Sequence, residues 1–86
     1  PRKTASLTYE LEYGQDTIEI HEDALAPGSK VYVIDDVLAT GGTAQATETL
    51  LHNMDVNVLG HRFLMRLSFL EGEARLKSDW KSLISI

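Results

Sequence analysis

The chain of 86 residues lacks cysteine altogether and is poor in proline and in basic residues. Without cysteine it has no thiol nucleophile, no thiolate metal ligand and no disulfide, and we therefore expect a reducing intracellular setting. Its 8 Lys and Arg residues against 13 Asp and Glu give a net charge of −5, which argues against nucleic acid as a partner. No stretch approaches the roughly 20 apolar residues of a membrane span, so we expect no membrane partner either.

The length of the chain allows one small domain. A chain of this size buries only about 60 to 65% of its unfolded surface, which makes a marginal core. Because we find no internal repeat, low-complexity tract or interior linker, residues 1–86 are predicted to form one unit with an N-terminal arm over residues 1–22. The first residue is Pro1 instead of Met, and we expect the chain to be a part of a longer protein.

Strand periodicity marks this arm. Apolar and polar residues alternate from Ala5 to Tyr13 and again from Thr17 to His21. Gly14, Gln15 and Asp16 between the two runs are typical turn residues, so the segment is predicted to be a β-hairpin. Because a two-stranded ribbon is only marginally stable by itself, its position should depend on what it packs against. We therefore interpret the hairpin as a candidate flap.

A buried strand and a helix are expected next. After Pro27-Gly28, the apolar run from Lys30 to Val37 is typical of a central strand of a parallel sheet that is covered on both faces. The helical spacing of apolar residues from Thr43 to Met54 predicts a helix, and Thr43 is able to cap its start.

The C-terminal part favours further strands. Two apolar segments at 56–59 and 63–67 are predicted to form the next strand or two, with Gly60 as a candidate bulge. A short helical turn is expected at 71–77 and a last strand at 80–86. The order of hairpin, strand, helix and strands predicts an α/β fold with a mostly parallel sheet.

The most informative stretch runs from Val31 to Thr43, VYVIDDVLATGGT. Its strand delivers Asp35 and Asp36 to a short loop with two glycines, at the edge of a parallel sheet where ligands usually bind. The glycines let several backbone N–H groups point one way, and the helix start adds unpaired donors, which suits a phosphate monoester. Two carboxylates beside such a cradle accept hydrogen bonds from sugar hydroxyls or hold hydrated Mg²⁺, so a sugar phosphate fits both halves. An ordinary polar turn is the alternative interpretation.

Two well-known nucleotide motifs are absent from this stretch. The Lys of a Walker A loop is missing, and the glycine spacing differs from the GxGxxG dinucleotide fingerprint. The sequence therefore argues against ATP hydrolysis and against hydride transfer as the function of this chain.

The segment Val31 to Thr43 resembles the phosphoribosyl pyrophosphate (PRPP) binding motif of the type I phosphoribosyltransferases. LEYG at 11–14, IEIHEDAL at 18–25 and Pro27-Gly28 are similar to the adenine-using branch of that family. The resemblance implies part of a type I phosphoribosyltransferase domain, with the hairpin as its flap and the PRPP strand and loop at 30–43. It also implies transfer of the phosphoribosyl group of PRPP to adenine, giving AMP and pyrophosphate in purine salvage, with Mg²⁺ bound through PRPP and a cytoplasmic homodimer.

The resemblance also implies residue roles. Asp35 and Asp36 are expected to face the ribose hydroxyls and to stabilise positive charge on the ribose in the transition state. Glu12 matches a mobile-loop glutamate expected to act as acid or base on adenine, and Tyr13 is expected to pack over the ligand or simply on the ribbon. The 5′-phosphate is expected to be held by Ala39, Thr40, Gly41, Gly42 and Thr43.

Other charged residues give weaker indications. The three histidines have no mutual spacing that predicts a metal site. Arg2 and Lys3 are candidates for neutralising pyrophosphate, and Arg66 stands where the family usually has an acidic residue, so an edge charge is one interpretation. The family is about twice as long as this chain, and most contacts to the base are expected in the half that is absent here. A non-catalytic regulatory module that binds PRPP or a nucleotide, and a short paralogue, remain as alternatives.

Overall fold

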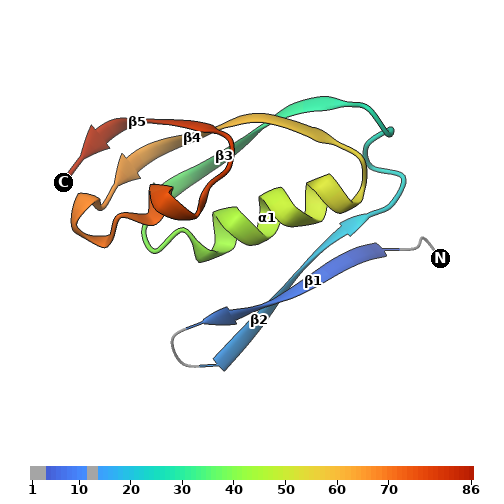
Figure 1. Ribbon diagram of the computed structural model, residues 1–86, viewed down its shortest axis with the longest axis horizontal. Coiled ribbons are helices and arrows are strands. Elements are labelled where there is room, and N and C mark those ends of the chain that lie inside the picture. The colour runs from blue at the N-terminus through green and yellow to red at the C-terminus, as the bar shows by residue number, and fades with distance from the viewer. Residues whose placement is uncertain (1–3, 12–13) are drawn as a thin grey trace.

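A computed structural model of the protein describes residues 4–11 and 14–86 and arranges them in three layers (Figure 1). A hairpin of β1 (Thr4–Leu11) and β2 (Gly14–His21) lies on one side of the helix α1 (Gly42–Asn53). The strands β3 (Lys30–Leu38), β4 (Asn57–Arg66) and β5 (Asp79–Ser85) form a sheet on the other side. Two short 3-10 turns, η1 (Ser68–Leu70) and η2 (Gly72–Arg75), connect β4 to β5. The predicted α/β fold with a hairpin is confirmed.

The hairpin follows the predicted alternation. Ala5, Leu7 and Tyr9 of β1 are half-buried, while the residues between them are exposed. The two strands pair antiparallel, with Leu7 opposite Ile18. The predicted turn at residues 14–16 is wrong, because these residues are already paired in β2 opposite residues 9–11. Pairing of the inward apolar side chains sets this register, and it takes precedence over the turn preference of residues 14–16.

The sheet is parallel, in the order β3-β4-β5. Val31 pairs with Val58 whereas Tyr32 pairs with Gly60, so the register shifts by one residue. The extra residue on β4 is Leu59. The irregularity predicted near Gly60 is confirmed, and the two apolar segments around it belong to one continuous strand.

One face of the sheet has no covering layer among the described residues. Ile34 is 79% exposed and Leu83 is 81% exposed, and with Leu64 they line a largely apolar groove of about 490 Å³. The prediction that the first strand of the sheet is covered on both faces is therefore wrong for this part of the chain, because α1 covers one face only. Within residues 4–11 and 14–86, β3 is also one of the two edge strands of the sheet.

The core lies between α1 and the sheet. Leu38, Ala44 and Phe63 form its buried cluster, and Leu76 and Trp80 pack against them. The helix ends where expected, since Asp55 just beyond it has φ of 60°. In the part of the chain that the structure describes, no helix is long and apolar enough to cross a membrane.

A buried polar cluster fixes α1 to the sheet and to the start of β5. The side chain of Glu48 on α1 is nearly inaccessible, and one of its carboxylate oxygens lies 3.2 Å from Nε2 of the fully buried His61 on β4. The backbone N–H groups of Lys77 and Ser78 donate to the same carboxylate at 2.9 Å each. His61 also stacks on Phe63, and its Nδ1 has no hydrogen-bond partner among the described residues. Three segments of the chain are thus held together by one carboxylate.

Candidate active site

Asp35 and Asp36 lie near the carboxyl end of β3, and both are exposed. Each carboxylate accepts a hydrogen bond from the backbone N–H of the next residue, at 2.8 Å for Asp35 and 2.9 Å for Asp36. These local bonds hold the carboxylates against their own strand. The second oxygen of each has no partner within the described residues, so it is available to a hydroxyl group or a hydrated cation.

A hollow of about 120 Å³ lies directly beyond the strand. The structure brings six of the predicted site residues together around it. Asp36 is not among them, because successive side chains of a strand point to opposite faces. The six that line the hollow are Asp35, Ala39, Thr40, Gly41, Gly42 and Thr43.

The start of α1 presents unpaired donors to this hollow. Gly41 occupies the N-cap position with φ of 84°, and no side chain caps the helix. The N–H of Gln45 donates to the carbonyl of Gly41 at 2.8 Å, and the N–H of Gly42 makes a long contact of 3.4 Å to Oγ1 of Thr40. The N–H groups of Thr43 and Ala44 have no partner one helical turn back. The first turn carries no acidic residue, so the positive end of the helix dipole is not neutralised. This arrangement favours an anion such as a phosphate.

Thr43 is not the helix cap. It lies inside the first turn of α1, and the left-handed conformation of Gly41 takes the cap position. The prediction of a Thr43 cap is therefore wrong, because a residue in a helix cannot aim its hydroxyl at its own first turn as an N-cap does. The Thr43 hydroxyl remains directed to other partners.

The loop is supported from behind by η2. A Cβ atom added to Gly41 would overlap the carbonyl oxygen of Gly72, and one added to Gly72 would overlap the carbonyl oxygen of Ala39. Two backbone segments therefore meet with no side chain between them. No sequence pattern marks Gly72 as a site residue, because its role depends on a contact with a loop about 30 residues earlier.

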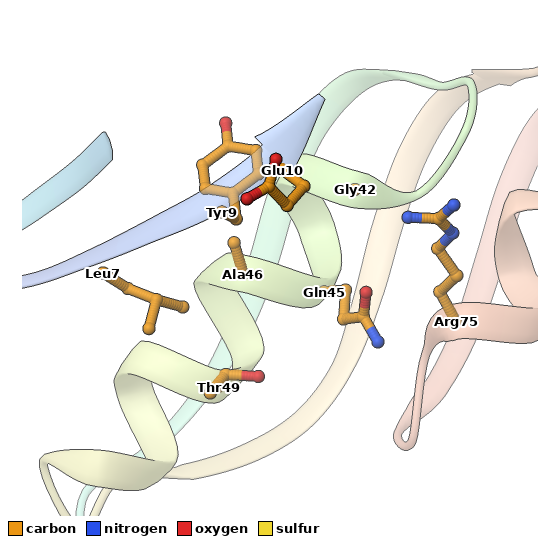
Figure 2. A pocket seen from close by; sticks show the side chains of 8 residues that line it. All are labelled: Leu7, Tyr9, Glu10, Gly42, Gln45, Ala46, Thr49 and Arg75. Carbon is orange, nitrogen blue, oxygen red and sulfur yellow. The ribbon is translucent and has the colours of Figure 1, made fainter. Parts of the chain in front are cut away.

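The hairpin reaches the same site. The hydroxyl of Tyr9 on β1 lies 3.1 Å from Oγ1 of Thr43. A second hollow, of about 240 Å³, separates β1 from the start of α1 (Figure 2). Tyr9 was not predicted to be a site residue, although the alternation in β1 places its side chain on the apolar, inward face of the strand.

A cation also faces this second hollow. The guanidinium of Arg75 on η2 points toward Gly42 (Figure 2), and it has no hydrogen-bond or ion-pair partner among the described residues. Arg75 lines this second hollow and not the hollow at residues 39–43, and it is the one Lys or Arg among the described residues that line the two hollows. It was missed because an exposed Arg in a loop carries no signal of its own.

Arg66 is the remaining candidate that the structure describes. Glu12 and Tyr13, like Arg2 and Lys3, fall outside the described residues. Arg66 lies on β4, which is the central strand, so its interpretation as an edge charge is wrong.

Arg66 instead holds η2 in place. Its guanidinium makes two hydrogen bonds to the Glu73 carboxylate, at 2.9 and 2.7 Å, and lies 5.1 Å from the centre of the Trp80 ring. The hydrogen bond from Arg66 lowers the pKa of Glu73. This pair joins the end of β4 to the turn that supports the loop.

The described residues contain no group of three or more His, Asp or Glu side chains that could enclose a metal ion. Asp35 and Asp36 supply hard oxygen atoms of the kind that Mg²⁺ prefers. A Mg²⁺ ion here would therefore take most of its ligands from water and from a bound phosphate compound.

The chain is similar in sequence to known proteins. No family model matches the chain. It is 53% identical over 77 residues to an adenine phosphoribosyltransferase of Desulfitobacterium hafniense, covering 90% of this chain and 44% of that relative. The chain spans less than half the length of the curated relatives that it matches.

Solved structures show the same fold. The crystal structure of adenine phosphoribosyltransferase from Thermoanaerobacter pseudethanolicus superposes with a TM-score of 0.94 at 45% identity, covering 100% of this chain and 51% of that one. The enzyme from Saccharomyces cerevisiae, complexed with an imino-altritol bisphosphate and adenine, has a TM-score of 0.92 at 40% identity, with 96% and 47% covered.

Proposed function

We propose that this chain, which is homologous to the C-terminal portion of the adenine phosphoribosyltransferases, forms the PRPP site of an enzyme that makes AMP and pyrophosphate from PRPP and adenine. One observation supports this most strongly. Asp35 and the loop 39–43 line a single hollow at the end of β3 and the start of α1. This hollow suits a ribose that carries a phosphate, because the Asp35 carboxylate and the start of α1, whose N–H groups favour an anion, both line it.

The loop would hold the 5′-phosphate of PRPP. The N–H groups at the start of α1 and the hydroxyls of Thr40 and Thr43 are donors, and a phosphate monoester is an acceptor at each of its terminal oxygens. Arg75 adds a positive charge beside Gly42. Because the phosphate is remote from the bond that breaks, its binding energy serves to fix the ribose for reaction.

The carboxylates would act on the ribose. In the reaction the bond from the anomeric carbon to pyrophosphate breaks, and a bond to a ring nitrogen of adenine forms. Positive charge grows on the ribose between these two events, and Asp35, with Asp36 on the same strand, supplies negative charge near it. Such charges lower the barrier because they stabilise the transition state more than the ground state.

The ring nitrogen of adenine must lose a proton as it bonds. We propose that Glu12 handles this proton, on the resemblance alone. Tyr9 on β1 contacts Thr43 at the loop, so the described part of the hairpin reaches the site. A closed hairpin would also keep water away from PRPP.

Mg²⁺ is proposed to bind through PRPP. The free carboxylate oxygens of Asp35 and Asp36 are suitable oxygen donors, directly or through water. The ion would neutralise the charge of the departing pyrophosphate.

The remaining half of a complete enzyme is proposed to cover the exposed sheet face. Ile34, Leu64 and Leu83 line an apolar groove there, and β3 offers a free edge in the described part of the chain. The curated relatives are more than twice as long as the matched part, which provides enough chain to cover both. We propose a cytoplasmic homodimer for the intact enzyme, on the resemblance and on the absence of cysteine.

The test is an assay of the intact protein that carries this chain, with PRPP and each purine base in turn. Formation of AMP from adenine, with little product from hypoxanthine or guanine, is the expected result. Asp35→Asn should lower kcat much more than PRPP affinity. Preference for another base would refute the assignment to adenine, and absence of any nucleotide product would refute the transferase.

A further inference from the structure

We infer that Tyr9 is a positioning residue that orients the Thr43 hydroxyl and couples the hairpin to the phosphate site. The two hydroxyl oxygens are 3.1 Å apart, and their residues are 34 positions apart in the chain. Thr43 lines the hollow at the start of α1, and Tyr9 comes from β1 in the layer beneath the helix. The inference deepens the proposed function, because it takes the hollow at the loop as a phosphate site.

The direction of the hydrogen bond depends on whether the site is occupied. In the free protein either hydroxyl is able to donate. A phosphate has acceptor oxygens, so Thr43 must give its single O–H to the phosphate when one is bound. The Thr43 oxygen then accepts from the Tyr9 O–H, because a hydroxyl can donate its own hydrogen and still accept another. The proton order becomes Tyr9 to Thr43 to phosphate.

This order makes the two hydrogen bonds mutually reinforcing. A hydroxyl that accepts a hydrogen bond becomes a better donor, and adjacent bonds polarise one another. Bound phosphate therefore strengthens the contact that holds β1 at the helix. By linkage, a docked hairpin strengthens phosphate binding by the same factor.

The hairpin is suited to such coupling because its position depends on the helix that it packs against. A two-stranded ribbon is marginal without support, and β1 rests on α1. A hollow of about 240 Å³ remains between β1 and the start of α1, beside Leu7 and Tyr9 (Figure 2). Because the ribbon depends on this one support, a hydrogen bond at the site end of β1 changes the docked population measurably.

Tyr9→Phe tests the coupling in the intact protein, because it removes the hydroxyl and keeps the ring that packs on α1. The probe is ribose 5-phosphate, a phosphate monoester that cannot react. We expect its Kd to rise about three- to tenfold, which is the range for one lost hydrogen bond. KM for PRPP should rise in the same way while kcat changes less.

Amide hydrogen exchange distinguishes this coupling from a purely structural role of Tyr9, because only coupling makes the protection of the hairpin depend on the ligand. Ribose 5-phosphate should increase the protection of β1 and β2 amides in the unaltered protein, and this increase should be lost in Tyr9→Phe. Thr43→Ser, which retains the hydroxyl, should keep the increase, and Thr43→Val should lose it. In the double variant, Tyr9→Phe should add little to Thr43→Val, because the two hydroxyls act as a unit.

Tyr32→Phe is the matched control. Tyr32 lies on β3 with its ring 4.6 Å from the Arg62 guanidinium and does not line the hollow, so its loss of a hydroxyl should change neither binding nor protection. Equal Kd values for Tyr9→Phe and the unaltered protein would overturn the inference, as would hairpin protection that persists without the Tyr9 hydroxyl. A failure to form AMP from adenine, with these binding results intact, would refute the proposed function and leave the coupling standing.

Discussion

The sharpest stability prediction concerns the Glu48 carboxylate. It accepts hydrogen bonds from the backbone N–H groups of Lys77 and Ser78 at 2.9 Å and lies 3.2 Å from Nε2 of His61. Glu48→Ala leaves all three groups without this partner. Since the residue is only 2% exposed, water cannot freely replace it.

The loss of unfolding free energy in Glu48→Ala follows from the number of hydrogen-bonding groups that lose their partner. A buried donor left unsatisfied costs about 1 to 3 kcal/mol. The Lys77 and Ser78 amides are only partly buried, so the low end of this range applies to each, and Glu48→Ala should cost about 3 kcal/mol. A small domain has a total stability of roughly 5 to 15 kcal/mol, so this is a large share. Glu48→Gln should cost less, because its carbonyl oxygen still accepts one or two of the hydrogen bonds.

The effect should depend on pH. Burial is the largest influence on Glu48 and opposes ionisation, but the hydrogen bonds from Ser78, Lys77 and His61 together outweigh it and lower the pKa of the carboxyl below its ordinary value of 4.5. A lowered pKa in the folded state means that the ionised carboxyl stabilises the fold above the ordinary value. This contribution is lost as the pH falls through the lowered pKa.

Urea denaturation at pH 7 and at lower pH values measures both effects. The difference in unfolding free energy between the unaltered protein and Glu48→Gln should be constant above about pH 5 and should shrink as the pH falls below 4.5. Glu19→Ala, an exposed carboxylate on β2, is the control and should stay within about 0.5 kcal/mol. A cost for Glu48→Ala below about 1 kcal/mol would refute the reasoning, and so would a pH-independent difference for Glu48→Gln.

Two further predictions concern the loop. Gly41→Ala should destabilise the protein more than Gly28→Ala in urea titrations and should also abolish ribose 5-phosphate binding, because the two glycines share φ near 85° but only a Cβ at Gly41 would overlap Gly72. Gly28→Ala should cost about 1 to 2 kcal/mol for the left-handed backbone alone, and equal costs would contradict the packing argument. Arg75→Gln should raise the Kd for ribose 5-phosphate about three- to tenfold at low salt and less at high salt, whereas Lys77→Gln should leave it unchanged. A salt-independent effect at Arg75 would show that its charge is not the cause.

Much of the fold could be predicted because its signals are local. Strict alternation predicted the hairpin, a continuous apolar run predicted β3, and helical spacing predicted α1. Most of the predicted ends lie within two residues of the observed ends. The same kind of signal failed where a tertiary contact competes with it. Turn preference suggested a reversal at residues 14–16, but the pairing of Leu7 with Ile18 sets the register.

Burial of Glu48 shows what a pattern can and cannot indicate. Position 48 falls between Ala44 and Leu51 at helical spacing, so its place on the inward face of the helix could be predicted from the sequence. Its partners were not, because the Lys77 and Ser78 amides are about 30 residues away and carry no side-chain signature. The burial of the Glu48 carboxylate therefore could not be predicted from the sequence.

The candidate site divides along the same line. Asp35 and the loop 39–43 are contiguous, so a single motif reveals the groups that would touch a ligand. What places these groups comes from elsewhere. The left-handed Gly41 fits only because Gly72 leaves room for it, and the Thr43 hydroxyl contacts the Tyr9 hydroxyl from the hairpin.

A variant that retains the whole VYVIDDVLATGGT string but carries Gly72→Ala would thus keep the motif and distort the loop at 39–43, because the new Cβ would overlap the carbonyl oxygen of Ala39. The motif specifies the ligand chemistry, and the backbone contact between the loop and η2 decides whether that chemistry is presented in one usable geometry.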